Sequence, residues 1–363
     1  MQAALGERVV LDASLWDEPT TGIGLYTRQL TGALQSLGVS VTRVGARFSG
    51  EHPRGGMGRT AFTFGKLPGV LSRIDAPLYH ALGNFNLPLV RPRGKRLVLT
   101  VHDLIPDLFP DTVSAGFRWQ FRLWLSRSLQ VADHVICVSQ RTREDLLSRF
   151  DVGVDQVSVV HHGVDHVGRV PALDATSEAY LRALTLPERY VLYAGSLDAR
   201  KNVGIVLDAL LRLGKERTLV LVGQSWFGAG PTEQRIAELR ADGYDVRPLG
   251  YQGEPVFYEL MRRAAVFVFP SRYEGFGLPP LEAMSLGVPT IVSNAGALPE
   301  VCGDAAVHVD AGDAASWAAA IERLLSSRNE AYALAQKGKE RARQFTWQRT
   351  AEKTLEVYRN VLR

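Results

Sequence analysis

Short apolar runs rich in β-branched residues alternate with longer segments of helical periodicity along most of the chain. In the first half these runs are RVVLDA, VSVTRVG, RLVLTVHD, HVICVS and VSVVHHGVD, and a helix is predicted from about Tyr26 to Leu37. Such alternation is typical of βαβ units, in which crossover helices connect buried parallel strands. The hydrophobic pattern therefore predicts an α/β fold with a parallel sheet.

A second series of the same kind follows a stretch from Asp165 to Thr176, which lacks periodicity and is predicted to be a linker. Its apolar runs are RYVLYAGS, TLVLVGQ, DVRPLGY, VFVFPS and PTIVSN, and the helices predicted between them cover about residues 203–213, 232–241, 258–263 and 280–286. The doubly wound pattern is thus repeated. From Ser316 onward the chain is predicted to be helical, and the Gly-, Pro- and Arg-rich residues 47–69 are predicted to form a mobile surface loop.

The two series predict two Rossmann-like domains, at residues 1–168 and 169–345, and a C-terminal helix at residues 346–363 that crosses back to the first domain. A length of 363 residues exceeds the size at which single cores usually stop growing, and 46% hydrophobic residues suffice for two cores. We expect a ligand site in the cleft between two such domains.

The charge and cysteine content exclude several classes of protein. With 42 basic and 38 acidic residues, the net charge of +4 is too small to indicate a nucleic-acid partner. Cys137 and Cys302 lie far apart, in apolar contexts and without metal-ligand spacing, which favours a reduced, cytoplasmic setting. No signal peptide and no run of 18 apolar residues is found, so the chain is predicted to be soluble or peripheral to a membrane.

The sharpest motif, SRYEGFGLPPLE, follows the apolar run VFVFP. Gly275 and Gly277 allow close approach of the backbone to a ligand, and Pro280 suits the first turn of a helix, whose free amides can receive an anion. Glu274 in the loop and Glu282 in the first helical turn are suited to accept hydrogen bonds from sugar hydroxyls. The alternative is structural: Glu282 favours a helix N-terminus and Glu274 is a solvated loop residue.

A cationic pair, Arg200 and Lys201, follows the predicted strand RYVLYAGS in the segment GSLDARKN. Arg can bind phosphate oxygens bidentately, and Lys supplies a mobile point charge. Solvated loop cations are the structural alternative. The place of the pair between a strand and a helix favours a pocket, and the absence of an Asp-x-Asp metal signature fits a metal-independent site.

A Gly-rich turn, with Gly22 and Gly24, precedes the first predicted helix and indicates the approach of a phosphate or a sugar. A dinucleotide-binding turn is the competing interpretation, but Thr27 replaces the third glycine of that fingerprint. No acidic residue follows the second strand to hold a ribose. A nicotinamide-dependent dehydrogenase is therefore disfavoured.

His102 ends the predicted strand RLVLTVHD, at the edge of the sheet where ligands bind. It is a candidate substrate contact, although a lone histidine is more often structural. Asp103 can cap the following turn.

Together these motifs resemble, in their order along the chain, the retaining glycosyltransferases of family 4, which have the GT-B fold; the closest likeness is to bacterial mannosyltransferase-like members. The resemblance implies that Arg200 and Lys201 stabilise the leaving diphosphate, that Glu274 and His102 orient the transferred sugar, and that Glu282 holds the ribose. The remaining positions that it assigns to donor binding are Gly22, Gly24, Gly195, Ser196, Phe276, Gly277 and Leu278.

The implied reaction transfers a hexose from a nucleoside diphosphate to a hydroxyl of a glycan or lipid-linked acceptor, without a metal or a tightly bound cofactor. Mannose from GDP-mannose, used in cell-surface polysaccharide or lipopolysaccharide synthesis, is favoured by the resemblance. A UDP-hexose donor stays open, as does a non-catalytic sugar-nucleotide-binding protein. A phosphorylase on the same fold is disfavoured, because it needs a cofactor lysine that the sequence does not show. An epimerase is disfavoured, because it would predict signatures other than the glutamate pair.

The segment from Phe117 to Gln130 combines aromatic residues with arginines. A helix of this composition can lie on the anionic inner membrane surface as a peripheral contact. A packed amphipathic helix is the favoured interpretation, because long Arg side chains commonly flank core faces.

Overall fold

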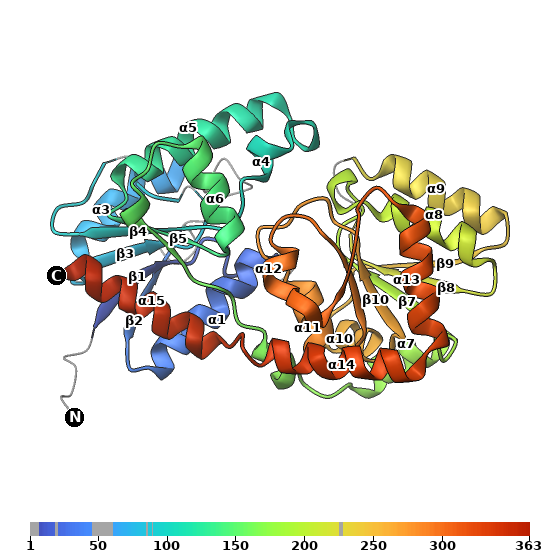
Figure 1. Cartoon of the computed structure of the whole chain (residues 1–363). Coiled ribbons are helices and arrows are strands. Elements are labelled where there is room, and N and C mark those ends of the chain that lie inside the picture. The colour runs from blue at the N-terminus through green and yellow to red at the C-terminus, as the bar shows by residue number, and fades with distance from the viewer. Residues whose placement is uncertain (1–6, 19–20, 46–60, 85, 89, 225–227) are drawn as a thin grey trace. The chain divides into compact units, whose positions relative to one another are not determined.

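The computed structural model describes residues 7–18, 21–45, 61–84, 86–88, 90–224 and 228–363 (Figure 1). The chain divides into two compact units. Unit 1 comprises Met1–Pro110, Ser114–Gly163 and Thr346–Arg363, and unit 2 comprises Asp111–Val113 and Val164–Phe345. Each unit is built around its own parallel sheet, so the predicted two-domain α/β architecture is confirmed.

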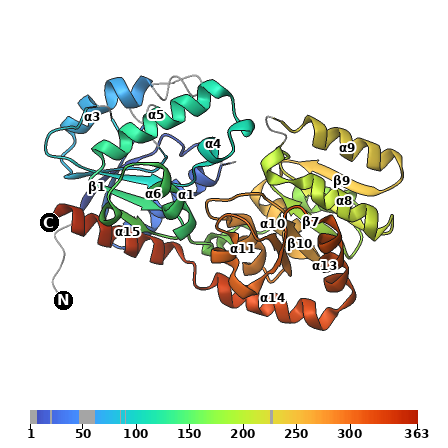
Figure 2. The same cartoon turned by 45° about the horizontal axis from the view of Figure 1, so that its top comes forward.

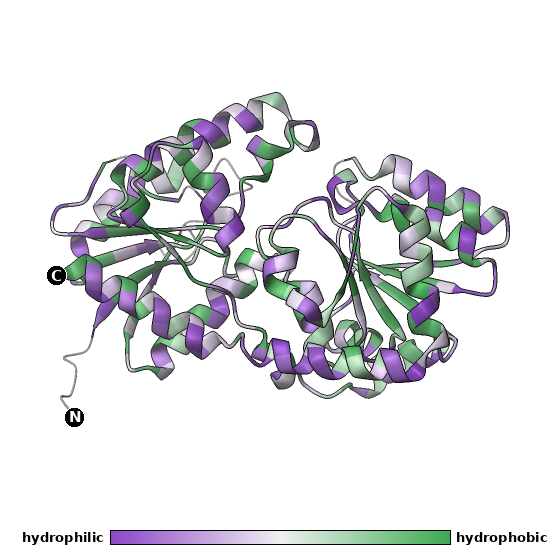
Figure 3. Cartoon of the chain, in the orientation of Figure 1, coloured by the Kyte–Doolittle hydropathy of each residue, from purple (hydrophilic) through white to green (hydrophobic). Residues whose placement is uncertain are grey.

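The sheet of unit 1 has six strands in the order β2-β1-β3-β4-β5-β6, all parallel. Their bounds are β1 Arg8–Asp12, β2 Ser40–Val44, β3 Leu78–Ala81, β4 Arg96–Val101, β5 His134–Cys137 and β6 Val157–Val159. Every predicted strand of this half is present, and the short β3 was not predicted. The strands of this sheet carry mainly hydrophobic residues, drawn green in Figure 3, as expected of strands covered on both faces.

Helices cover both faces of this sheet (Figures 1 and 2). The helical elements are α1 Gly22–Ser36, η2 Phe62–Lys66, α3 Leu67–Arg73, α4 Ile105–Leu108, η3 Pro110–Thr112, α5 Ala115–Val131, α6 Gln140–Arg149, η4 Val154–Gln156 and α15 Trp347–Leu362. Alternate strand residues face opposite helices: Val10 packs in the core with α3, α5 and α6, whereas Val9 and Leu11 pack with α1 and α15. The C-terminal helix α15 therefore completes the core of unit 1.

The structure describes only the second part of the loop predicted at residues 47–69. Residues 47–60 lie outside the described residues. Its second part was predicted wrongly, because η2 and α3 are helical. Phe62, Leu67 and Leu71 are buried in the core under the sheet, and this burial outweighs the turn-forming glycines of the preceding sequence.

The sheet of unit 2 also has six parallel strands, in the order β12-β11-β10-β7-β8-β9. Their bounds are β7 Val191–Ala194, β8 Thr218–Val222, β9 Asp245–Gly250, β10 Val266–Phe269, β11 Thr290–Ser293 and β12 Val307–Val309. The three-residue β12 was not predicted. The helical elements are η5 Asp165–Arg169, α7 Ala175–Ala183, η6 Ala199–Lys201, α8 Val203–Leu213, α9 Gly230–Ala241, α10 Glu254–Arg263, α11 Leu278–Ser285, α12 Leu298–Cys302, η7 Gly303–Ala305, α13 Ala314–Ser326 and α14 Arg328–Ala342.

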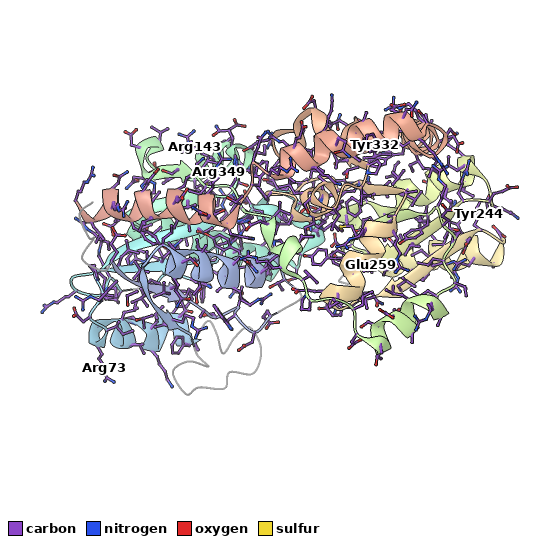
Figure 4. The ribbon with its side chains drawn as sticks, turned by 90° about the horizontal axis from the view of Figure 1, so that it is seen from below. Arg73, Arg143, Tyr244, Glu259, Tyr332 and Arg349 are labelled. Atoms are coloured by element: carbon purple, nitrogen blue, oxygen red, sulfur yellow. The ribbon has the colours of Figure 1, made fainter. Side chains whose placement is uncertain are left out.

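Helices α8, α9 and α13 bury apolar residues against one face of this sheet, and α11 and α14 lie against the strands β10 and β11. The segment predicted as helical from Ser316 onward is three helices, separated near Ser327 and between Ala342 and Trp347. Polar side chains extend outward, as Arg73 at the end of α3 and Tyr332 on α14 show in Figure 4. No helix among the described residues is long and apolar enough to cross a membrane.

Candidate active site

The predicted residues Arg200, Lys201 and Glu274 meet at the carboxyl edge of the unit 2 sheet. Arg200 and Lys201 are in η6, directly after β7, and Glu274 is in the loop after the neighbouring strand β10. Oε1 of Glu274 accepts hydrogen bonds from Nη1 of Arg200 at 3.0 Å and from Nζ of Lys201 at 2.8 Å. The three side chains are only 12–13% exposed. The solvated-loop alternative is therefore wrong for these residues.

The carboxylate in this cluster stays ionised although it is buried. Burial alone would raise the pKa of Glu274, but the charges of Lys201 and Arg200, with hydrogen bonds from Lys201 and Ser271, outweigh it and lower the pKa to about 2. Two cations thus share one carboxylate, and the cluster carries a net positive charge in a poorly solvated place. Such a cluster is suited to bind a further anion.

Asp198 fixes the backbone of the cationic pair. Its Oδ1 accepts from the backbone N–H of Arg200 at 3.0 Å and of Lys201 at 3.2 Å, as an N-cap does. Its Oδ2 accepts from the hydroxyl of Ser196 at 2.6 Å. Ser196, predicted to bind the donor, thus supports this turn in the structure. Asp198 was not singled out from the sequence, although an acidic residue two positions before the pair is a recognisable cap signal.

Asn202 holds the other end of η6. Its φ of 56° lies in the left-handed region, which few residues other than glycine adopt. The side-chain amide donates to the carbonyls of Pro270 at 3.2 Å and Ala311 at 2.8 Å, which follow β10 and β12. This residue therefore ties the cationic loop to two other strand ends.

The second glutamate, Glu282, lies on α11 and has different partners from Glu274. Its Oε1 accepts from the hydroxyl of Tyr258 at 3.0 Å and from Nε2 of His166 at 3.1 Å. All three residues are buried. Burial, followed by the charge of Glu282, raises the pKa of Tyr258, so this hydroxyl remains a donor. Sequence reasoning missed both partners.

The start of α11 differs from the prediction. The helix begins at Leu278, not near Pro280, so Glu282 lies just beyond the first turn. Gly277, with φ of 104°, forms the N-cap, and a Cβ there would lie 2.7 Å from Leu298 Cδ2. Because Pro279 and Pro280 have no N–H, only Leu278 among the first three helical residues can offer an amide to an anion.

The remaining predicted donor-binding positions have structural surroundings of their own. Phe276 is buried, with its ring centroid 5.9 Å from that of Phe345. Gly195, at the end of β7, has a φ of 152° and donates its N–H to the carbonyl of Val222. These contacts leave the backbone, rather than the Phe276 side chain, as the part that can face a ligand.

In unit 1 the predicted residue His102 follows β4 and is buried. Its Nε2 lies 2.8 Å from the carbonyl of Leu82, which requires the proton on that nitrogen. Burial lowers the pKa of His102 to about 4, against the opposing effect of this hydrogen bond. At neutral pH the ring is therefore uncharged, and its Nδ1 carries a lone pair that can accept a hydrogen bond.

Other aromatic rings of unit 1 pack around this histidine. Tyr26 lies at a ring-centroid distance of 5.0 Å, and His162 stacks at 5.4 Å. His80 lies nearby in the same sheet, with Nε2 2.7 Å from the hydroxyl of Thr100. Burial lowers the pKa of His80 to about 3 and that of His162 well below its usual value.

The Gly-rich turn begins α1 at Gly22, with Thr21 as its N-cap. The hydroxyl of Thr21 accepts from the N–H of Gly24 at 3.0 Å. A Cβ on Gly24 would lie 2.2 Å from the carbonyl oxygen of Glu18, whereas one on Gly22 would meet nothing within 4 Å. Packing of its own chain accounts for glycine at 24, and the space beside Gly22 is open.

Among the described residues, no group of three or more His, Cys, Asp or Glu side chains is arranged to hold a metal ion.

Comparison with known proteins identifies two family models. Glycosyltransferase Family 4 matches residues 20–167, and Glycosyl transferases group 1 matches residues 181–341. These two stretches carry the histidine edge of unit 1 and the charged edge of unit 2, respectively.

Characterised relatives and solved structures agree with these matches. O-antigen chain mannosyltransferase B of Escherichia coli is 31% identical over 289 residues, which cover 78% of this chain and 74% of that protein. Alpha-maltose-1-phosphate synthase of Mycolicibacterium smegmatis is 32% identical over 288 residues, 73% of each protein. The structure of Anabaena HepE in complex with UDP and glucose aligns over 98% of this chain and 100% of its own, with a TM-score of 0.75 and 19% identity. The last match supports the fold.

Proposed function

The chain belongs to the glycosyltransferases of the group 1 and family 4 type, and from this premise we propose that it transfers mannose from GDP-mannose to a hydroxyl of a glycan or lipid-linked acceptor, with retention of the anomeric configuration. The observation that carries the proposal is the buried cluster of Arg200, Lys201 and Glu274. Synthesis of a cell-surface polysaccharide is the favoured context, because the Escherichia coli relative is named as an O-antigen mannosyltransferase.

Charge development on the departing diphosphate is the step that this cluster fits. When the glycosidic bond to phosphate breaks, negative charge accumulates on the leaving oxygen. Preorganised cations in a poorly solvated site stabilise such charge far more than they do in water. Arg200 and Lys201 supply these cations, and Asp198 and Asn202 hold their backbone in place. This is the work that a metal ion does in other transferases.

The roles of the other predicted residues belong to the same proposal. Glu274 is placed to accept hydrogen bonds from sugar hydroxyls once phosphate oxygens share its cations. Glu282 receives the ribose, and Nδ1 of His102 accepts from a hydroxyl of the sugar. A UDP-hexose donor is the alternative, supported by the UDP and glucose named for the HepE complex. The proposal includes a cytoplasmic location, supported by the two buried free thiols, Cys137 and Cys302.

Thermal unfolding with GDP, UDP, ADP and dTDP tests the donor class, because a ligand that binds only the folded state raises its stability by mass action. We expect a selective stabilisation by GDP that is lost in Glu282→Ala and kept in Tyr190→Phe, a buried substitution in the same unit. An assay for transfer of mannose from GDP-mannose to an acceptor glycan then tests the reaction itself. Selective stabilisation by UDP would indicate a UDP-hexose donor in place of GDP-mannose. If no nucleotide at millimolar concentration changes the melting temperature, the proposal is overturned.

A peripheral contact with an anionic membrane is a second part of the proposal, and the outer face of α5 favours it. The inner face, with Phe121 and Leu125, packs on the sheet, as the amphipathic-helix interpretation expects. The outer face nevertheless exposes Trp119 by 70% and Leu123 by 49%, one helical turn apart. The helix contains no acidic residue. Core packing does not account for these two side chains, whereas a lipid interface accepts them.

Co-sedimentation with phosphatidylcholine vesicles, with and without phosphatidylglycerol, tests this contact. Binding should require the anionic lipid, and Trp119→Ser with Leu123→Ser should weaken it about a hundredfold or more, since each buried apolar side chain contributes about 1.5–3 kcal/mol. Tyr332→Ser is the matched control, because Tyr332 on α14 is 68% exposed and is equally aromatic (Figure 4). An equal loss of vesicle binding in the α5 double variant and in Tyr332→Ser, or binding that does not depend on the anionic lipid, would contradict the contact.

A further inference from the structure

Three elements of unit 2 meet at Glu282. The glutamate lies on α11, Tyr258 lies on α10, and His166 lies on the short helix η5, which begins one residue after the start of the Val164–Phe345 segment. Each of the three residues is 5% exposed. The hydroxyl of Tyr258 also lies 3.1 Å from Nε2 of His166, so the three polar groups form one closed triangle.

Both donors act on the same oxygen of the carboxylate. A carboxylate oxygen has two lone pairs in its plane, and Oε1 receives the hydroxyl of Tyr258 and the Nε2–H of His166. Its acceptor capacity is therefore filled by the protein. Within the part of the chain that the structure describes, Oε2 accepts no hydrogen bond, and it is not among the fully buried unsatisfied atoms. One oxygen of Glu282 is held and the other is left for a ligand.

We propose that His166 and Tyr258 are positioning residues, which hold Glu282 so that Oε2 accepts a hydrogen bond from a ribose hydroxyl and thereby selects ribonucleotides over deoxyribonucleotides. This inference rests on the proposed function, in which Glu282 receives the ribose. Neither residue touches the sugar in this arrangement. Each acts through the carboxylate.

Holding the carboxylate changes selectivity more than it changes affinity for diphosphate. Rotation about the last torsion of a glutamate is broad, so an unheld carboxylate can turn away from a ligand that lacks a hydroxyl. When Oε1 is fixed by two donors, Oε2 cannot turn, and a deoxyribose leaves it desolvated and without a partner. Sites built to hydrogen-bond a hydroxyl reject analogues lacking it for this reason.

Calorimetric titration with GDP and UDP and with their 2′-deoxy and 3′-deoxy analogues tests the assignment. For the wild type, removal of the hydroxyl that Glu282 binds should weaken binding about tenfold or more. Tyr258→Phe and His166→Leu should reduce this ratio to about threefold or less. His166→Gln should restore it, because the Gln amide can donate from nearly the position of Nε2.

Tyr190→Phe is the matched control for stability. The hydroxyl of Tyr190 donates to the carbonyl of Leu260 at 2.5 Å, so this variant also removes a buried tyrosine hydrogen bond made to α10. It should lower the melting temperature about as much as Tyr258→Phe does, and it should keep the wild-type ratio of ribose to deoxyribose affinity. A structural role alone would move the melting temperature of both variants and the selectivity of neither.

The outcomes separate this inference from the proposed function. If the wild type binds no nucleoside diphosphate, the proposed function fails and the inference with it. If the wild type discriminates and Glu282→Gln abolishes the discrimination, while Tyr258→Phe and His166→Leu keep it, the positioning role is overturned and the proposed function stands. If all three variants lose the discrimination and Tyr190→Phe keeps it, the positioning role is supported.

Discussion

The two units carry the same type of sheet, but the polar groups at the carboxyl edges of the two sheets are opposite in character. In unit 1 the histidines near the edge are neutral, because burial lowers the pKa values of His80, His102 and His162. In unit 2 the edge is charged, because Arg200 and Lys201 hold Glu274 in its ionised form. The histidines of one unit are thus uncharged, whereas the carboxylate of the other is held in ion pairs.

The two edges differ in how their titratable groups avoid the free-energy cost of burying a charge. Burial disfavours the charged form of every titratable group. The histidines of unit 1 respond by losing their protons. Glu274 instead keeps its charge, since two cations lie within hydrogen-bond distance. A buried ion pair can exchange one anion for another, so under the proposed function the edge of unit 2 receives the diphosphate, and His102 of unit 1 accepts from a sugar hydroxyl.

The largest expected effect is that of acidification on the stabilities of the two units. The unfolded chain binds protons on its histidines near pH 6.5, whereas folded His102 and His80 do so only near pH 4 and 3. Between these values the unfolded state binds more protons, so unit 1 loses up to about 1.4 kcal/mol of stability per histidine for each pH unit of acidification. Glu274 contributes stability that is present above its unfolded pKa of 4.5 and is lost toward pH 2. Unit 1 should therefore unfold at a higher pH than unit 2.

Hydrogen exchange with mass spectrometry between pH 7 and pH 4 measures this difference, with β3 and β4 reporting on unit 1 and β7 and β10 on unit 2. The slope with pH should flatten in His80→Gln. His134→Gln should flatten it less, because the ring of His134 is partly exposed at the amino end of β5, although burial lowers its pKa as well. Earlier loss of protection in β7 and β10 would contradict the comparison.

Removal of a cation should lower turnover next most strongly. Arg200→Ala leaves Lys201 as the single partner of Glu274 and removes one stabiliser of the leaving diphosphate, so we expect kcat to fall by about 10²–10³. Arg217→Ala is the control, because Arg217 pairs with Glu322 through two hydrogen bonds at the amino end of β8. Steady-state kinetics with the donor sugar nucleotide gives the measurement. Equal losses in the two variants would mean that fold stability, and not charge, was measured.

The sequence predicted the edge residues better than it predicted what holds them. Arg200 and Glu274 were found because each follows a long apolar run, and glycines and a proline mark the turns beside them. The strands β3 and β12 were missed, since runs of four and three residues are too short to show a period.

The hydrogen-bond partners of Glu282 could not be predicted, for a different reason. His166 and Tyr258 lie 116 and 24 positions from Glu282, and no local pattern encodes which helices meet. The start of α11 was misplaced because the positive φ of Gly277, which allows the earlier helix start, depends on packing against Leu298. The pattern of a sequence thus locates chemistry at strand ends, and tertiary packing decides which lone pairs remain available.

Substitution of Asn202 should have a smaller effect, on the stability of the charged edge of unit 2. This residue has a positive φ and holds the end of η6 by two hydrogen bonds. Asn202→Gly keeps the positive φ and loses two hydrogen bonds, which should cost about 1–3 kcal/mol. Asn202→Ala should cost about 1 kcal/mol more, since Cβ disfavours the left-handed region. Denaturant unfolding measures both. Thr185→Gly, at a described residue with φ of 44° in the same unit, is the control, because it relieves similar backbone strain without removing the two hydrogen bonds of Asn202. A loss of stability in this control equal to that in Asn202→Gly would contradict the role of those hydrogen bonds.

The smallest effect concerns how two helices begin, α1 in unit 1 and α8 in unit 2. The Thr21 hydroxyl caps α1 by accepting from the N–H of Gly24, whereas Asn202, at the N-cap of α8, makes no such bond because its side chain binds elsewhere. Thr21→Ala should therefore cost unit 1 about 1 kcal/mol, and Thr21→Ser should cost little. The cap also competes with any anion for the Gly24 amide. If that amide binds the donor diphosphate, Thr21→Ala should strengthen nucleotide binding while it weakens the fold, as calorimetry and denaturant unfolding would show together. Weaker binding in step with weaker stability would instead assign this turn to the structure of unit 1 alone.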